Sequence, residues 1–179
     1  MKLTWFAGMT FRLHIGGEIV VTDPDGAPEA VDAAELTSGA GRVVHRRDAG
    51  IAAFDPVSWR PRRPKRMIDA AAGTARPEVF RLEGGFAFEA PEEGLVVLLD
   101  CDVTADAGWD RWADNAVVIL EGTAQAASAA GMTLLKGARP RLIALGVADA
   151  VADAAFDALA PRLDGAGLIV LEPGLAVEI

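Results

Sequence analysis

The second half of the chain alternates short apolar runs with longer alanine-rich stretches, and this rhythm constrains the fold more than any other feature. A run of four or five apolar residues suits a strand, whereas the alanine-rich stretches have the length of helices. Strands are predicted at residues 95–99, 116–120, 142–145, 168–171 and 175–179, and helices at 123–131 and 148–163. Such alternation predicts a mixed α and β fold, with helices covering a sheet.

The helix predicted at residues 148–163 has an amphipathic pattern. Val151, Ala155, Phe156, Leu159 and Leu163 recur at spacings near four residues. These side chains are therefore expected on the buried face of that helix.

The first 25 residues predict three antiparallel strands, at 2–6, 10–15 and 18–22. Gly16 and Gly17 separate the last two, and a two-residue connection of glycines favours a tight hairpin because both turn positions need positive φ. In the second strand Phe11, Leu13 and Ile15 alternate with polar residues, which places His14 on the wetter face of the sheet.

The middle of the chain predicts a second hairpin around Gly84 and Gly85, with strands at 78–82 and 86–89. Residues 54–77 contain four prolines, which favours a loop, with one short helical turn at 67–72.

Length and composition limit the classes that the chain can belong to. Its 179 residues predict a single domain spanning residues 1–179. No apolar run approaches the roughly 20 residues that cross a bilayer, and the N-terminus lacks the apolar core of a signal peptide, so we expect no membrane association and a cytoplasmic location. One cysteine, Cys101, cannot form an internal disulfide, which agrees with a reducing compartment. The net charge of −9 repels polyanions, so we do not expect nucleic acid as a partner.

Several segments carry a resemblance to a known family. They are KLTWFAGMTFR at 2–12, IGG at 15–17, VVTDP at 20–24, LLDCDVT at 98–104, DNAVVIL at 114–120 and LIVLEPG at 168–174. In this order they resemble the lactonase-like metal-dependent hydrolases of the metallo-β-lactamase fold. The resemblance implies an α/β (α+β) architecture, a shortened four-layer αββα sandwich.

The family's metal ligands are mostly missing. Its enzymes bind zinc or iron through an H-x-H-x-D-H motif, further histidines and a bridging aspartate, whereas this chain has two histidines, His14 and His45. The bridging aspartate carries over onto Asp102, and no histidine occurs near Leu145 and Gly146, where the family's last one would fall. A catalytic zinc needs three protein ligands and one open position. We therefore expect no metal or other cofactor, with Asp102 as a vestigial ligand and Zn²⁺ as the cofactor only if the chain is a hydrolase.

Asp102 and His45 are the candidate catalytic residues of a reduced site. The interpretation that we favour makes Asp102 a structural aspartate that caps or hydrogen-bonds a turn at a strand end, and His45 a partly exposed residue of a strand or loop. Cys101 stands between two aspartates, which disfavour its thiolate, so we expect a buried and unreactive thiol.

One basic segment lies in this acidic protein, since residues 42–66 hold eight Lys or Arg and two Asp. Arg46, Arg47, Arg62 and Arg63 are therefore candidate ligands for a phosphate or another small molecule. The alternative is a solvated, proline-rich loop that pairs with acidic residues elsewhere in the chain.

Three functions compete. The first is a metal-free descendant of the family's hydrolases that acts by binding or assembly. The second is a metal-dependent hydrolase of lactones, esters or phosphate esters with a reduced site around Asp102, and the third is a phosphate or small-ligand binder that uses the arginines. A homodimer is also expected, with Trp59, Trp109 or Trp112 as candidate anchors.

Overall fold

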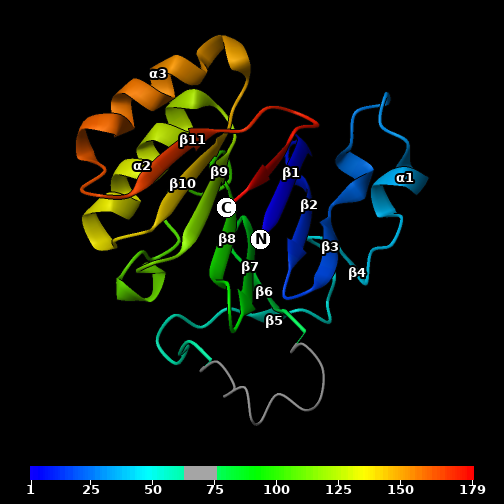
Figure 1. Cartoon of the computed structure of the whole chain (residues 1–179). Coiled ribbons are helices and arrows are strands. Elements are labelled where there is room, and N and C mark those ends of the chain that lie inside the picture. The colour runs from blue at the N-terminus through cyan, green and yellow to red at the C-terminus, as the bar shows by residue number, and fades with distance from the viewer. Residues whose placement is uncertain (63–75) are drawn as a thin grey trace.

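The computed structural model describes residues 1–62 and 76–179, and it contains two mixed β-sheets (Figure 1). The helical turn predicted at 67–72 lies outside the described residues. The five-stranded sheet has the order β12-β1-β2-β3-β4. Its strands are β1 (Lys2–Ala7), β2 (Thr10–Ile15), β3 (Glu18–Thr22), β4 (Arg42–Val44) and β12 (Ala176–Glu178).

The seven-stranded sheet has the order β11-β10-β9-β8-β7-β6-β5. Its strands are β5 (Ala52–Ala53), β6 (Glu78–Leu82), β7 (Gly85–Ala90), β8 (Gly94–Asp100), β9 (Val117–Glu121), β10 (Leu142–Gly146) and β11 (Gly167–Val170). Strands β8 to β11 run parallel to one another. The predicted mixture of strands and helices is thus confirmed.

The two predicted hairpins are also confirmed. Gly16 and Gly17, with φ of 59° and 75°, form the turn between β2 and β3. Phe11, Leu13 and Ile15 are fully buried while His14 is exposed, as the alternation in β2 predicts. Strands β6 and β7 pair antiparallel across the second turn.

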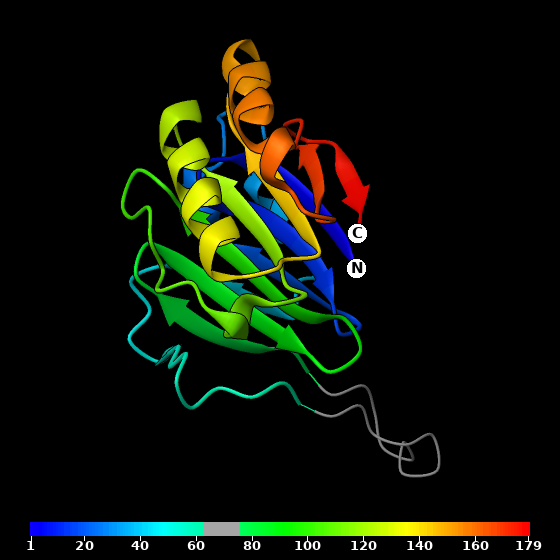
Figure 2. The same ribbon diagram turned by 90° about the vertical axis from the view of Figure 1, so that its left-hand side faces the viewer.

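Two apolar cores hold the layers together. One lies between the two sheets and contains Phe11, Leu13, Phe86 and Ile119. The other lies between the seven-stranded sheet and the helices α2 (Ala124–Gly137) and α3 (Asp149–Leu159). Figure 2 shows these two helices lying side by side on that sheet.

The outer face of the five-stranded sheet carries one short helix, α1 (Ala33–Thr37) (Figure 1). Arg12 of β2 holds it there, because its guanidinium donates to the backbone oxygens of Leu36 and Ser38. Asp32 caps the first turn by accepting from the N–H of Ala34. Within the described residues, no helix has both the length and the apolar character needed to cross a membrane.

The predicted buried face of α3 is wrong in part. Ala152, Ala155 and Leu159 are buried, whereas Val151 and Phe156 are 43% and 37% exposed. The small alanines allow the helix to approach the sheet closely, which leaves the larger side chains on its flanks.

Candidate functional site

Acidic side chains gather where three parallel strands end. Asp100 is the last residue of β8 and Glu121 the last of β9, and the two are neighbours in the sheet. Gly146, at the end of β10, lies beside Glu121 on its other side. In sheets of this type, ligands bind beyond the carboxyl ends of the strands, so this edge is the first place to look for a site.

Arg46 reaches this edge from the other sheet, where it follows β4. Its Nε lies 2.6 Å from Oδ2 of Asp23, and its backbone N–H donates to Oδ1 of the same residue at 2.8 Å. Its Nη1 lies 2.8 Å from Oδ2 of Asp100. One guanidinium therefore joins a carboxylate of each sheet, and we call Arg46, Asp23, Asp100, Asp102 and Glu121 the Arg46 cluster.

Both carboxylates that face Arg46 are largely buried. The side chains of Asp23 and Asp100 are 16% and 14% exposed, while Arg46 is 45% exposed. Charge-assisted contacts at these distances are among the stronger hydrogen bonds in proteins. Removing the cation would leave two largely buried carboxylates without their counter-charge, so Arg46 fits the role of a built-in counter-ion.

The carboxylate of Asp102 binds the segment that connects β9 to α2. Its Oδ1 accepts from the hydroxyl of Thr123 at 2.9 Å, and its Oδ2 accepts from the Thr123 N–H at 3.2 Å. Thr123 is the N-cap of α2 and accepts from the N–H of Ala126. Gly122, with φ of 129°, packs so closely that a β-carbon there would lie 3.0 Å from Oδ2 of Asp102. Asp102 thus orients the residue that caps α2.

Glu121 has an altered acidity. Burial, together with the charges of Asp100 and Asp102, raises its pKa to about 7, against a smaller lowering by Arg46. A carboxyl group with such a pKa exchanges protons near neutrality. Glu121 was not predicted from the sequence, although an acid directly after an apolar parallel strand is a usable signal.

Cys101 lies on the other side of the strand end, in the core beneath the helices. It is 4% exposed. Burial first, and then the charges of Glu121, Asp100 and Asp102, raise its pKa to about 12. The thiol is therefore protonated at neutral pH, as an unreactive cysteine would be.

His45 does not contact Asp102 by any hydrogen bond or ion pair of the described residues. Its Nδ1 lies 3.7 Å from Oδ2 of Asp25, whose side chain is 92% exposed. Its backbone N–H donates to Asp48. The two candidate catalytic residues are consequently engaged with different partners.

The candidate ligand-binding arginines do not form one group. Arg46 belongs to the cluster, and Arg47 is exposed. Arg62 pairs with the buried carboxylate of Glu89 and lies 3.3 Å from Glu78. Arg63 lies outside the described residues.

Two of the tryptophans proposed as interface anchors are buried. Trp109 and Trp112 are each 8% exposed and stack on each other with centroids 5.3 Å apart. Trp59 is half-buried and, with Trp112, lines a recess of about 960 Å³ beside residues 56–61. Trp109 and Trp112 therefore belong to the core, and they leave little surface for a partner.

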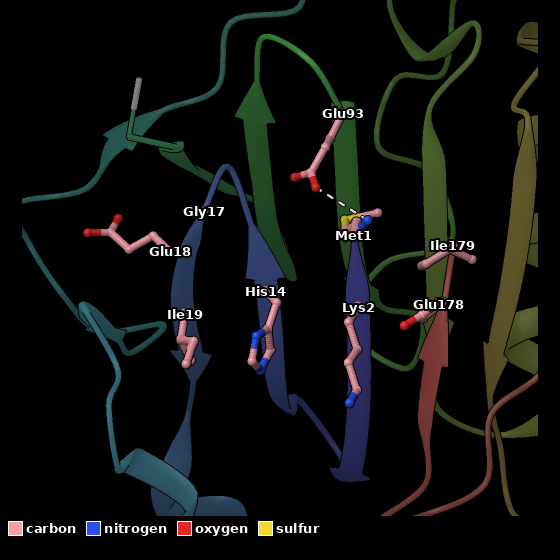
Figure 3. A pocket seen from close by; sticks show the side chains of 9 residues that line it. All are labelled: Met1, Lys2, His14, Gly17, Glu18, Ile19, Glu93, Glu178 and Ile179. Carbon is pink, nitrogen blue, oxygen red and sulfur yellow. Dashed lines mark ion pairs between the residues drawn. The ribbon is translucent and has the colours of Figure 1, made fainter. Parts of the chain in front are cut away.

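A second, open recess of about 760 Å³ lies on the outer face of the five-stranded sheet (Figure 3). Ile19, His14, Lys2 and Glu178 form a row across β3, β2, β1 and β12. Burial, with the nearby charges of Arg12 and Lys2, lowers the pKa of His14. The side chains stand next to one another and do not converge on a point (Figure 3), so this recess does not resemble a reaction centre.

Metal-binding capacity can be judged from the donors present. Among residues 1–62 and 76–179, no group of three or more His, Cys, Asp or Glu side chains has the arrangement to hold a metal ion. Where the resemblance implies a further histidine, at the end of β10, the chain has Gly146, which has no side chain to offer a ligand. The Arg46 cluster offers carboxylates alone, and Arg46 already neutralises two of them.

Comparisons of the sequence with family models, of the chain with curated proteins and of its structure with solved structures find no match.

Proposed function

We propose that this chain is a metal-free descendant of the metallo-β-lactamase-fold hydrolases and acts by binding or assembly. The family is inferred from the sequence segments that resemble it. The absence of a metal is inferred from the Arg46 cluster, in which a guanidinium provides the positive charge.

The layered arrangement supports the proposed descent. Two sheets pack face to face, with α2 and α3 on the outside of one and α1 on the outside of the other. We interpret this as a reduced four-layer αββα sandwich, in which a helix of five residues is what remains of one outer layer.

The observation that carries the proposal is the position of the Arg46 guanidinium between Asp23 and Asp100, at 2.6 and 2.8 Å. Two neighbouring carboxylates supply oxygen ligands of the kind that divalent cations prefer. Here a covalently attached cation supplies the positive charge, and a guanidinium holds no water to be activated as a nucleophile.

The remaining donors also favour this proposal. Asp102, the carry-over of the bridging ligand, accepts two hydrogen bonds from Thr123. The histidines lie elsewhere, His14 on the outer face of the five-stranded sheet and His45 next to Asp25. A zinc site built from the cluster would have to recruit imidazoles that the chain does not place there.

One observation favours the hydrolase alternative. The pKa of Glu121, raised to about 7, is that of a usable general acid or base. Phosphate binding is less favoured, because the carboxylates around Arg46 and Arg62 neutralise these cations.

A hydrolysis assay tests the proposal. The purified chain is incubated with lactone, ester and phosphate-ester substrates, each without metal and with added Zn²⁺ or Mn²⁺. We expect no turnover above that of buffer with the same metal. Turnover that requires metal and disappears in both Asp102→Asn and Glu121→Gln, but not in the exposed control Asp153→Asn, would establish the hydrolase instead.

A further inference from the structure

Within residues 1–62 and 76–179, strand β11 is the last strand of the seven-stranded sheet and pairs with β10 alone. Helix α3 packs on one of its faces, and Ile169 packs on the core between the sheets. Gly167 and Leu171 donate their N–H groups to the backbone oxygens of Arg141 and Leu145. Because a strand alternates the direction of its backbone groups, the N–H and C=O of Leu168 and Val170 point away from β10.

Strand β11 is a short edge strand, but it lacks charged residues and proline, two of the features that usually protect an edge. Among the edge strands of the described residues it is the longest, with four residues against three in β4 and β12 and two in β5. Residues 167–171 contain no charge and no proline. Natural edges are normally short, charged, bulged or covered, because an unpaired apolar edge is a template for another strand.

Two exposed apolar side chains lie beside this edge. Of the six large apolar side chains that are exposed in the described part of the chain, Phe156 belongs to α3 and Leu175 to the segment joining β11 to β12. Val151 lies on the opposite flank of α3 and does not contribute. Since β–α–β crossovers are right-handed, the flank of α3 that carries Phe156 faces the β11 side. Figure 2 shows β11 and β12 at one lateral border of the molecule.

We propose that β11 pairs antiparallel with β11 of a second copy of this chain, about a two-fold axis at Ile169. In this register Leu168 of one copy lies opposite Val170 of the other. Each such pair exchanges two N–H···O bonds, so the four outward groups of each strand find partners at the same time. The strand is therefore complementary to itself, as a two-fold interface requires.

The charges agree with this register. Glu172 would face Ala166 and Asp164 would face Gly174, so no like charges stand directly opposite each other. The diagonal neighbour of Glu172 is Asp164, which Arg139 of its own copy neutralises at 3.3 Å. The proposal deepens the assembly role proposed above and rests on it. The test measures the molar mass of the protein in solution. Because the buffer contains EDTA, the result does not depend on whether the chain binds zinc.

Light scattering after size-exclusion chromatography measures that mass over a range of micromolar concentrations. We expect a dimer for the native chain. Val170→Pro removes one outward N–H and no bond to β10, so we expect a monomer with unchanged circular dichroism. Phe156→Glu should weaken the dimer at least tenfold, whereas Val57→Glu, the same change at an exposed site remote from β11, should leave it intact.

Two results would overturn the proposal. One is a monomer mass for the native chain at all concentrations. The other is a dimer that persists in both Val170→Pro and Phe156→Glu, because the copies would then meet through another surface.

Discussion

Nη1 of Arg46 lies 2.8 Å from Oδ2 of Asp100, and this contact connects the segment after β4 in one sheet to the end of β8 in the other. Nε of the same guanidinium binds Asp23, so Arg46 links the two sheets at the edge where they meet. We call Arg46, Asp23 and Asp100 the clasp between the sheets.

Replacing Arg46 should destabilise the fold. Arg46→Met leaves Asp23 and Asp100 largely buried without their counter-charge, and we expect a loss of about 1–3 kcal/mol in the free energy of unfolding at pH 7. Urea denaturation measures it. Arg47→Met, one residue further along and exposed, should change stability by less than about 0.5 kcal/mol. Equal effects of the two variants would contradict the clasp.

Removing the Asp102 carboxylate should loosen the start of α2. Asp102→Ala deprives Thr123 of two hydrogen bonds, and the poorer cap should cost about 1 kcal/mol. Amide exchange at residues 124–127 should accelerate, while the exchange of α3 amides stays the same. Asp153→Ala, on exposed helix surface, is the control. Unchanged exchange in the first turn of α2 would show that Asp102 does not support the cap.

The protonation of Glu121 should make stability depend on pH. Its pKa rises from 4.5 to about 7 on folding, so the folded state holds the proton more tightly. The stabilising contribution is complete below about pH 4.5 and is lost as the pH rises towards 7. Glu121→Gln should therefore be more stable than the native chain at pH 8, by about 1–2 kcal/mol, with a smaller difference at pH 5. A difference that grows towards low pH would contradict this sign.

The thiol of Cys101 should be unreactive in the folded protein. Burial and three neighbouring carboxylates raise its pKa to about 12, so almost no thiolate is present at pH 8. We expect no reaction with an aromatic disulfide reagent until urea unfolds the chain, and then one thiol per chain. Rapid labelling of the native protein would show that the thiol is accessible.

Much of the fold follows from local sequence patterns. Gly16 and Gly17 predict the first hairpin because only glycine readily adopts two consecutive positive φ angles. The short apolar runs predict β8 to β11, and their ends lie within one residue of the observed ones. These features depend on neighbouring residues, which the sequence displays directly.

The remaining features depend on long-range contacts. The clasp joins residues 23, 46 and 100, and no local pattern predicts that one arginine meets two distant aspartates. The prediction of the buried face of α3 was wrong in part because hydrophobicity scales rank Val151 and Phe156 above alanine. In the structure the residues that pack on the sheet include the small Ala152 and Ala155. Five-residue α1 was missed because a single turn has no periodicity to detect.

The zinc content of the native chain tests the central claim most directly. The protein is incubated with excess Zn²⁺ at pH 7.5, freed of loose metal by gel filtration, and its zinc is counted per chain. The guanidinium between Asp23 and Asp100 predicts far less than one zinc per chain. One zinc per chain that is retained by the native protein and lost in Asp100→Asn would contradict the account.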